Sequence, residues 1–226
     1  MPPRHHETEI KLRVANPAAL CMTLRTLGAR LLHRVHERNT LFDSPRQRLR
    51  KKGQLLRLRS ERTLGPSKAP VRYLLTYKGP GLELRGGPSP ARFLGVSPGS
   101  LRRYKVREEV ETPVSEPQRL ARVLTSIGLV PSFRYEKYRT TYRLPRLGRL
   151  LIELDQTPIG VFLELEGSPP LIDRASRLLG YSPRDYLVAS YAGLYFDHCR
   201  RHHIPPGDML FAMLRKPQKK LRRTPL

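Results

Sequence analysis

The stretch "HHETEIKLRV" (residues 5–14) alternates charged and apolar side chains. In a β-strand Glu7, Glu9 and Lys11 share one face, because successive side chains point to opposite sides. The stretch therefore predicts a strand with one charged and one apolar face. It gathers two carboxylates in a chain whose formal net charge is +24, so the question is which groups lie against them.

The same alternation recurs along the chain. Further strands are expected at the start of a second half near residue 105, and over about 31–43, 54–61, 72–79, about 133–144, 149–156 and 160–167. The side chains expected on the charged faces are Glu7, Glu9, Lys11, Arg57, Arg59, Lys78, Arg107, Glu109, Glu111, Lys137, Arg139, Thr141, Glu153, Asp155, Glu164 and Glu166.

Two architectures use such strands. A sandwich would turn each charged face to water, whereas a closed barrel would turn the charged faces inward and pack the apolar faces against outer helices. Nearly all the strands mix acids and bases with few neutral polar residues, which favours the barrel. The expected fold class is α+β: an eight-stranded antiparallel β-barrel, or tunnel, with helices packed outside.

The chain also repeats itself at an offset of 100 residues. Glu9 matches Glu109, and Pro17 and Gly28 have counterparts at positions 117 and 128. Proline suits the first turn of a helix and glycine its end, so each half is expected to begin with a strand and a helix. Asn16 is a candidate cap of the first helix, and Ser115 with Gln118 is a candidate capping box for the second.

The boundaries follow from composition. One domain over residues 1–201 is expected, with halves at about 5–79 and 104–167 joined by a Gly/Pro-rich loop at 79–103. A C-terminal helix is expected over 182–201. Residues 202–226 are expected to be a basic, disordered tail.

Composition excludes some classes of protein. No apolar run is long enough for a transmembrane helix, and two cysteines cannot form a disulfide framework or a structural zinc site. We therefore expect a cytoplasmic protein without membrane partners, either a monomer or a homodimer. The high charge favours a polyanionic ligand, and the tail could contact nucleic acid or polyphosphate without sequence specificity.

Clustered glutamates supply the oxygen ligands that Mg²⁺ or Mn²⁺ prefers, and clustered arginines and lysines suit a phosphate chain. Metal, carboxylates and basic groups in one cavity are the components of phosphoryl chemistry.

In these features the chain resembles the CYTH superfamily, also called triphosphate tunnel metalloenzymes. The segment "ETEIK" matches the family's ExExK signature, and the resemblance continues through "LRKKGQLLRLR", "LTYKG", "REEVE", "YEKYRTTY" and "IGVFLELEG". It implies a triphosphate bound inside an eight-stranded tunnel.

The resemblance also implies roles for individual residues. The metal would be held by Glu7, Glu9, Glu164 and Glu166. Triphosphate oxygens would be bound by Lys11, Arg57, Arg59, Lys78, Arg107, Lys137 and Arg139. Catalysis would depend on Glu9, Arg57, Lys78, Glu109 and Glu111, the last two being able to hold a second metal or to orient water. Ser190 and Tyr191 resemble a segment that closes one tunnel end.

Several reactions stay open. A metal-dependent hydrolase acting on inorganic tripolyphosphate or a nucleoside triphosphate is favoured over a class IV adenylate cyclase, because no base-stacking motif can be assigned beyond the candidates Tyr73, Tyr77 and Phe93. Thiamine triphosphatase ranks third because the chain has no tryptophan. A non-enzymatic polyphosphate or nucleic-acid binder is the alternative of another class.

Overall fold

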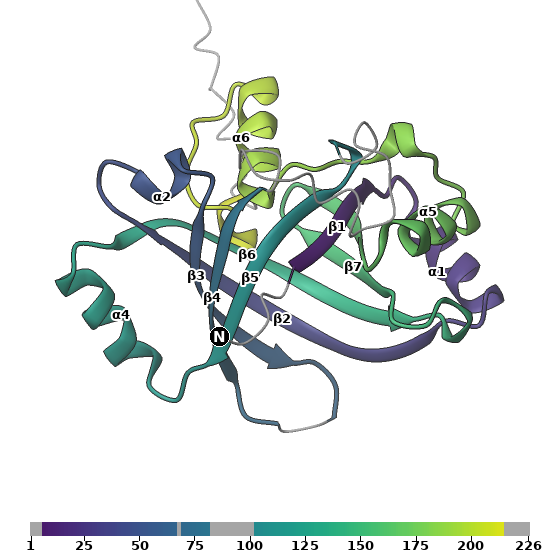
Figure 1. Cartoon of the computed structure of the whole chain (residues 1–226), viewed down its shortest axis with the longest axis horizontal. Coiled ribbons are helices and arrows are strands. Elements are labelled where there is room, and N and C mark those ends of the chain that lie inside the picture. The colour runs from purple at the N-terminus through teal and green to yellow at the C-terminus, as the bar shows by residue number, and fades with distance from the viewer. Residues whose placement is uncertain (1–5, 67–68, 82–101, 215–226) are drawn as a thin grey trace, which may run out of the picture.

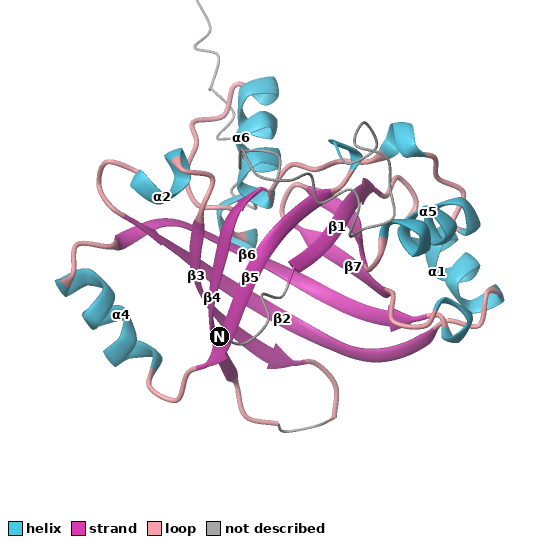
Figure 2. Ribbon diagram, in the orientation of Figure 1, coloured by secondary structure: helices cyan, strands magenta, loops and turns pink. Residues whose placement is uncertain are grey.

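The computed structural model describes residues 6–66, 69–81 and 102–214. Its eight strands form one closed barrel in the order β1-β5-β4-β3-β2-β6-β7-β8, and every neighbouring pair is antiparallel (Figures 1 and 2). The strands are β1 (His6–Arg13), β2 (Arg30–Asp43), β3 (Leu55–Thr63), β4 (Arg72–Gly81), β5 (Lys105–Pro113), β6 (Val130–Arg143), β7 (Leu151–Thr157) and β8 (Gly160–Glu166). The predicted eight-stranded tunnel fold is confirmed.

Helices surround this barrel. They are α1 (Pro17–Thr26), α2 (Arg48–Lys51), α4 (Pro117–Ser126), α5 (Pro169–Leu178), α6 (Tyr191–His202) and α7 (Phe211–Leu214), with short 3-10 turns η3 (Pro145–Leu147) and η4 (Pro183–Asp185). In the part of the chain that the structure describes, no helix is long and apolar enough to span a membrane.

The two halves have equivalent local structure. Each begins with a strand and a helix that starts at proline, and Gly28 and Gly128 follow the two helices with φ of +76° and +86°. Glycine tolerates this left-handed conformation without the steric cost of a Cβ atom. The Asn16 side chain caps α1 by accepting from the Ala19 N–H at 3.0 Å, as expected. The predicted capping box of Ser115 is wrong: α4 begins after Glu116, whose side chain makes no capping hydrogen bond.

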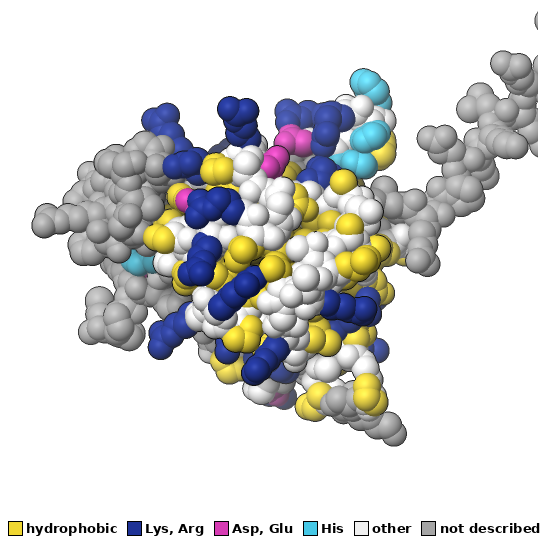
Figure 3. Space-filling model, turned by 90° about the vertical axis from the view of Figure 1, so that its right-hand side faces the viewer, with side chains coloured by type: hydrophobic (Ala, Val, Ile, Leu, Met, Phe, Trp, Pro, Cys, Tyr) yellow, Lys and Arg dark blue, Asp and Glu magenta, His cyan; other side chains and the backbone are white. Residues whose placement is uncertain are grey.

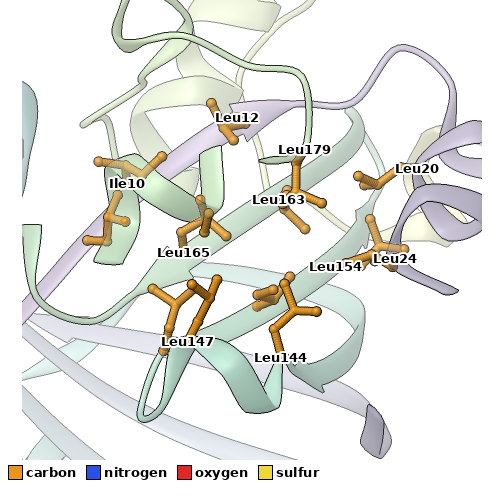
Figure 4. Packing of buried hydrophobic residues seen from close by; sticks show 14 of the residues in the cluster. Ile10, Leu12, Leu20, Leu24, Leu144, Leu147, Leu154, Leu163, Leu165 and Leu179 are labelled. Carbon is orange, nitrogen blue, oxygen red and sulfur yellow. The ribbon is translucent and has the colours of Figure 1, made fainter. Parts of the chain in front are cut away.

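The apolar faces of β1, β7 and β8 point outward and pack under α1 and α5 (Figure 4). Ile10, Leu163 and Leu165 are fully buried there, and Leu20 and Leu24 of α1 close over them. Burial of each such side chain contributes about 1.5–3 kcal/mol. This layer stabilises the strands from outside and leaves their charged faces to line the barrel.

The second helix is not equivalent in its packing. Leu124 of α4 is buried, but Val123 and Ile127 of the same apolar stripe are 56% and 68% exposed. Figure 1 shows α4 at the edge of the molecule, away from the α1 and α5 layer. The sequence repeat therefore predicts the strands and the helix ends, but it does not predict which surface each helix packs against.

One end of the barrel is covered by α6, whose first residue Tyr191 packs against Tyr135 and Phe162. The expectation of a continuous helix over 182–201 is wrong. Ser182 and Asp185 form a capping box, but it begins only the short turn η4. The chain is then extended, Leu187 exchanges backbone hydrogen bonds with Lys11 of β1, and α6 begins after the cap Ser190.

The expected tail is also ordered in its first part. Met209 is fully buried against β6, and its backbone pairs with Arg134 and Glu136. The prediction of a disordered segment from residue 202 is therefore wrong up to Leu214, because Met209 and α7 pack on the barrel. Residues 215–226 and most of the predicted loop, 82–101, lie outside the described residues, as does Phe93.

Candidate active site within the barrel

The barrel encloses a cavity of about 840 Å³, which we call the tunnel cavity. Its charged lining residues are Glu7, Glu9, Lys11, Arg57, Arg59, Lys78, Lys105, Arg107, Glu108, Glu109, Glu111, Lys137, Arg139, Glu153, Glu164 and Glu166. Every metal, triphosphate and catalytic candidate from the sequence thus lies in one cavity. The alternative in which the charged faces meet bulk water outside a sandwich is wrong, because the helices cover the opposite, apolar faces.

The lining is balanced in charge. Eight acidic and eight basic residues line the cavity, so the chain's formal charge of +24 comes from residues elsewhere. The face in Figure 3 agrees with this, since Lys and Arg far outnumber Asp and Glu on it. The acids that the sequence contains are therefore concentrated where they can neutralise the internal bases.

The first group of contacts surrounds Glu9. Its Oε1 atom accepts from Lys11 Nζ at 3.0 Å and from Lys105 Nζ at 2.5 Å. Burial raises the pKa of Glu9, but the charges of Lys105 and Lys11 outweigh burial and hold it well below its ordinary value. Burial lowers the pKa of Lys105 to about 8, although Glu9 opposes this shift. Lys11 also contacts Glu164 Oε1 at 2.7 Å, which links β1 to β8.

A second group lies across β1, β4, β5 and β3. Lys78 Nζ contacts Glu7 Oε2 at 2.5 Å and Glu109 Oε2 at 3.1 Å. Arg57 lies 3.9 Å from Glu109 and 3.7 Å from Glu111, and its NH2 group donates to Thr76 at 3.0 Å. Each of these two cations is shared among several acceptors.

The third group is centred on Asp155, which is fully buried behind the lining. Its carboxylate accepts from Lys137 Nζ at 2.8 Å, from Arg139 through two nitrogens at 2.7 and 2.6 Å, and from the Tyr191 hydroxyl at 2.6 Å. The group connects β6 and β7 to the helix that covers the barrel end. Asp155 is thus a structural partner of the phosphate-binding candidates Lys137 and Arg139.

Besides Glu7, whose pKa is raised by burial and by the charge of Glu9, two further carboxyl groups are poorly neutralised. Burial raises the pKa of Glu153 to about 7, against the opposing charge of Arg139, which contacts it directly. Burial and the charges of Glu7 and Glu153 raise the pKa of Glu166 to about 8. Both groups hold a proton near neutral pH more readily than an ordinary glutamate, and a nearby divalent cation would remove that preference.

These closely spaced carboxyl groups show whether the cavity lining suits a metal ion. Glu9 and Glu166 are direct partners in the β1–β8 register, and the negative neighbours of Glu166 make the site unfavourable for further anions but favourable for a cation. Carboxylate oxygens are the ligands of Mg²⁺ and Mn²⁺, so the donor chemistry fits. Among the described residues no three acidic, histidine or cysteine side chains already converge in a metal-binding geometry, because Glu7 and Glu9 are turned to lysines.

The sequence reasoning missed three charged residues: Glu108, which lines the cavity, and Lys105 and Glu37. Lys105 has the same alternation as Arg107 and Glu109, so its inward position could have been predicted. Glu37 is 1% exposed and lies 3.4 Å from Arg59 and 3.5 Å from Lys137. Its neighbours in the sequence, His36 and Arg38, are also charged or titratable, so the pattern alone does not identify the inward face.

The raised pKa of Glu153 predicts a pH-dependent stability difference. Between about pH 4.5 and pH 7 the folded state keeps a proton on Glu153 that the unfolded state has released. The free energy of unfolding of the wild type therefore decreases as the pH rises through this range. A Glu153→Gln variant lacks this titration. We expect its melting temperature relative to wild type to increase between about pH 4.5 and about pH 7 and to level off above that range.

Thermal melts across this range check the prediction, with Glu116→Gln as control because Glu116 pairs with Arg119 on the exposed surface of α4. A difference between Glu153→Gln and wild type that is constant or falls with pH would contradict it. The charged groups near Glu153 are Arg139, Glu164, Asp155, Lys137 and Glu166. All five are kept in both proteins.

The family model described as the CYTH domain matches residues 5–173. A curated protein of Methanocaldococcus jannaschii named "Putative adenylate cyclase" is 22% identical over 175 residues, which are 76% of this chain and 83% of that protein.

Solved structures show the same fold. A protein of Pyrococcus horikoshii OT3 superposes with a TM-score of 0.65 at 20% identity, covering 85% of this chain and 99% of its own. A Hippeastrum protein, described as a "putative adenylyl cyclase" with a dominant triphosphatase activity, has a TM-score of 0.53 at 20% identity and covers 88% and 97% of the two chains.

Proposed function

Because the chain belongs to the CYTH domain family, we propose that it is a metal-dependent hydrolase that cleaves a triphosphate bound in the tunnel cavity. The observation that carries this proposal is the cavity itself: eight basic and eight acidic side chains around about 840 Å³ inside a closed barrel. A triphosphate chain needs several cations, and a divalent metal needs carboxylates. Both sets line this one cavity.

We assign phosphate binding to the basic residues of the lining. Arg57, Arg59 and Arg139 can bind two oxygens each through planar guanidinium groups, and the lysines act as point charges. The set is Lys11, Arg57, Arg59, Lys78, Arg107, Lys137 and Arg139, to which the structure adds Lys105 as a neighbour. These groups would neutralise the charge that develops on the departing diphosphate.

We assign Mg²⁺ or Mn²⁺ to Glu7, Glu9, Glu164 and Glu166, with Glu7 and Glu9 released from their lysines when phosphate binds those lysines. A bound divalent ion supplies charge stabilisation at the phosphate oxygens. Glu109 and Glu111 lie beside Arg57, where they could orient a water. The water oxygen forms a bond to the terminal phosphorus, the bridging P–O bond breaks, and orthophosphate and a diphosphate are the products.

Adenylate cyclase is the second candidate. The name of the M. jannaschii relative favours it, whereas the description of the Hippeastrum protein favours hydrolysis. A cytoplasmic setting is part of the proposal and agrees with two cysteines that stay unpaired, Cys21 and Cys199. Nucleic-acid binding by the basic surface is the non-enzymatic alternative, and it should persist in EDTA and weaken with salt.

The proposal predicts turnover that depends on a divalent cation. Purified protein is incubated with tripolyphosphate, ATP or thiamine triphosphate, each with Mg²⁺, with Mn²⁺ or with EDTA, and orthophosphate, pyrophosphate and cyclic AMP are measured. We expect orthophosphate from at least one compound and none in EDTA. Cyclic AMP with pyrophosphate from ATP would instead identify a cyclase, and no product from any compound would refute an enzymatic role on these substrates.

A further inference from the structure

A second cavity of about 510 Å³ lies at the barrel end near α2 and α6, and we call it the end chamber. Its walls are largely apolar: Leu49, Leu56 and Val188 line it together with the rings of Phe133 and Phe196. The tunnel cavity differs in character, since charged side chains dominate its lining. A volume of this size is in the range of small-molecule sites.

The two cavities are continuous in their lining. Leu55, Lys105, Arg107 and Ser190 line both. The junction therefore carries two basic side chains, one of them held toward Glu9 and the other donating to the backbone oxygen of Gly53. A ligand with an anionic chain and an apolar end group could occupy both cavities at once. The point where its anionic chain meets its apolar group would lie near Lys105 and Arg107.

The chamber wall formed by α2 is fixed before any ligand binds. The Asp43 carboxylate accepts from the backbone N–H groups of Ser44, Leu49 and Arg50 at 2.7–2.9 Å. The Arg50 guanidinium lies 4.9 Å from the centre of the Phe196 ring, which joins α2 to α6 across the chamber. A short helix of four residues would otherwise be only marginally stable, so these contacts give the chamber a defined shape.

We propose that the end chamber binds the organic group of the substrate, and that the substrate is therefore an organic triphosphate with a flat group of nucleoside size rather than inorganic tripolyphosphate. This inference rests on the proposed function. Inorganic tripolyphosphate has no apolar surface and would gain nothing from the chamber. The aliphatic and aromatic walls offer apolar contact to a heterocyclic base, and the Gln47 and Gln54 side chains in the lining offer hydrogen bonds to its edge.

The proposal also orients the chain of phosphates. The phosphate that carries the organic group lies near Lys105 and Arg107, and the terminal phosphate lies deeper, toward Arg57 and Arg59. Water attack on the terminal phosphorus then releases orthophosphate and leaves the organic diphosphate. The reacting centre is thus separated from the organic group.

Val188→Trp tests the proposal, because Val188 lines the chamber, is 43% exposed and can be enlarged without opening the packed core. We expect kcat/KM for ATP to fall at least about tenfold while kcat/KM for tripolyphosphate changes less than about twofold. Leu49→Ala is the second variant, and it should likewise lower kcat/KM for ATP more than kcat/KM for tripolyphosphate. Met22→Trp, on the exposed surface of α1, is the control and should change neither value.

Equilibrium dialysis with ATP and with tripolyphosphate separates this inference from the proposed function. If Val188→Trp weakens the binding of ATP but not that of tripolyphosphate, the result supports the proposal that the end chamber binds the organic group. This holds even if neither compound is hydrolysed, in which case only the hydrolase proposal fails. Equal effects on both compounds, or no effect on ATP from either chamber variant, would overturn the chamber proposal and leave hydrolysis standing. Binding of neither compound to wild type would refute both.

Discussion

Replacing Asp155 with asparagine is expected to lower the free energy of unfolding by about 3–5 kcal/mol. For a chain of this length that corresponds to a fall in melting temperature of roughly 6–20 °C, at about 2–4 °C per kcal/mol. The size of the effect follows from burial. Asp155 is 0% exposed, and it is bound by both Lys137 and Arg139. Removing its charge leaves two buried cations with less compensation than they need.

The loss would extend to the covering helix. The Tyr191 hydroxyl donates to Asp155, and the amines of Lys11 and Lys137 lie 5.2 and 5.0 Å from the centre of the Tyr191 ring. An asparagine can still accept from the tyrosine but offers a weaker acceptor. We therefore expect α6 to be less firmly held, with faster amide exchange in its first turn.

Asp173→Asn is the matched control. Asp173 accepts from two tyrosine hydroxyls, those of Tyr104 and Tyr186, at 2.7 and 2.8 Å, and no Lys or Arg ion pair to it is seen among the described residues. Asparagine can still accept a hydrogen bond there, so the substitution should cost only about 1 kcal/mol, the net contribution of an ordinary hydrogen bond. Chemical denaturation of the three proteins decides the matter: an Asp155→Asn protein no less stable than Asp173→Asn would show that the buried charge is not required.

The sequence predicts the interior of this protein better than its ends. Alternation with a period of two assigns a face to every charged residue once the strand is known, and closure of the barrel then decides which face is internal. This is why Glu7, Arg57 and Lys137 could be placed in one cavity without coordinates. The structure locates them there; their roles in metal and phosphate binding stay predictions.

The ends depend on contacts between distant segments. The capping signal at Ser182 is real, but the helix cannot continue because Leu187 pairs with Lys11 of β1. The largely apolar segment "DMLFAML" (208–214) lies in a region whose basic composition predicts disorder. In the structure its Met209 is nevertheless fully buried. The end chamber is lined by residues of seven helices and strands from β2 to α6, so no local pattern could have predicted it.

Replacing Glu9 with glutamine is expected to lower kcat/KM for the preferred triphosphate by about 10³-fold or more, equivalent to about 4 kcal/mol of transition-state stabilisation. It should also weaken Mn²⁺ binding at least about tenfold in calorimetric titration. The amide keeps the size of the side chain but loses the charge that a hard divalent cation requires. Glu9 pairs in register with Glu166, so its loss removes one of two adjacent acidic ligands.

The fold should survive this change, in contrast to Asp155→Asn. Lys11 retains Glu164 at 2.7 Å. Burial already lowers the pKa of Lys105 to about 8, and Glu9 is the main group that opposes this shift. Without Glu9, Lys105 releases its proton more readily near neutral pH, so no unpaired charge has to stay buried. The circular dichroism spectrum should therefore match that of wild type.

Glu61→Gln is the control. Glu61 also forms an ion pair, with Arg59 at 3.1 Å, but it is not one of the proposed metal ligands. A modest effect of Glu61→Gln beside a large effect of Glu9→Gln would assign the loss to the metal site rather than to general charge imbalance in the barrel. A Glu9→Gln protein with wild-type turnover and wild-type Mn²⁺ affinity would remove Glu9 from that site. The metal would then have to be held by Glu7, Glu164 and Glu166 without the second glutamate of the ExExK pattern.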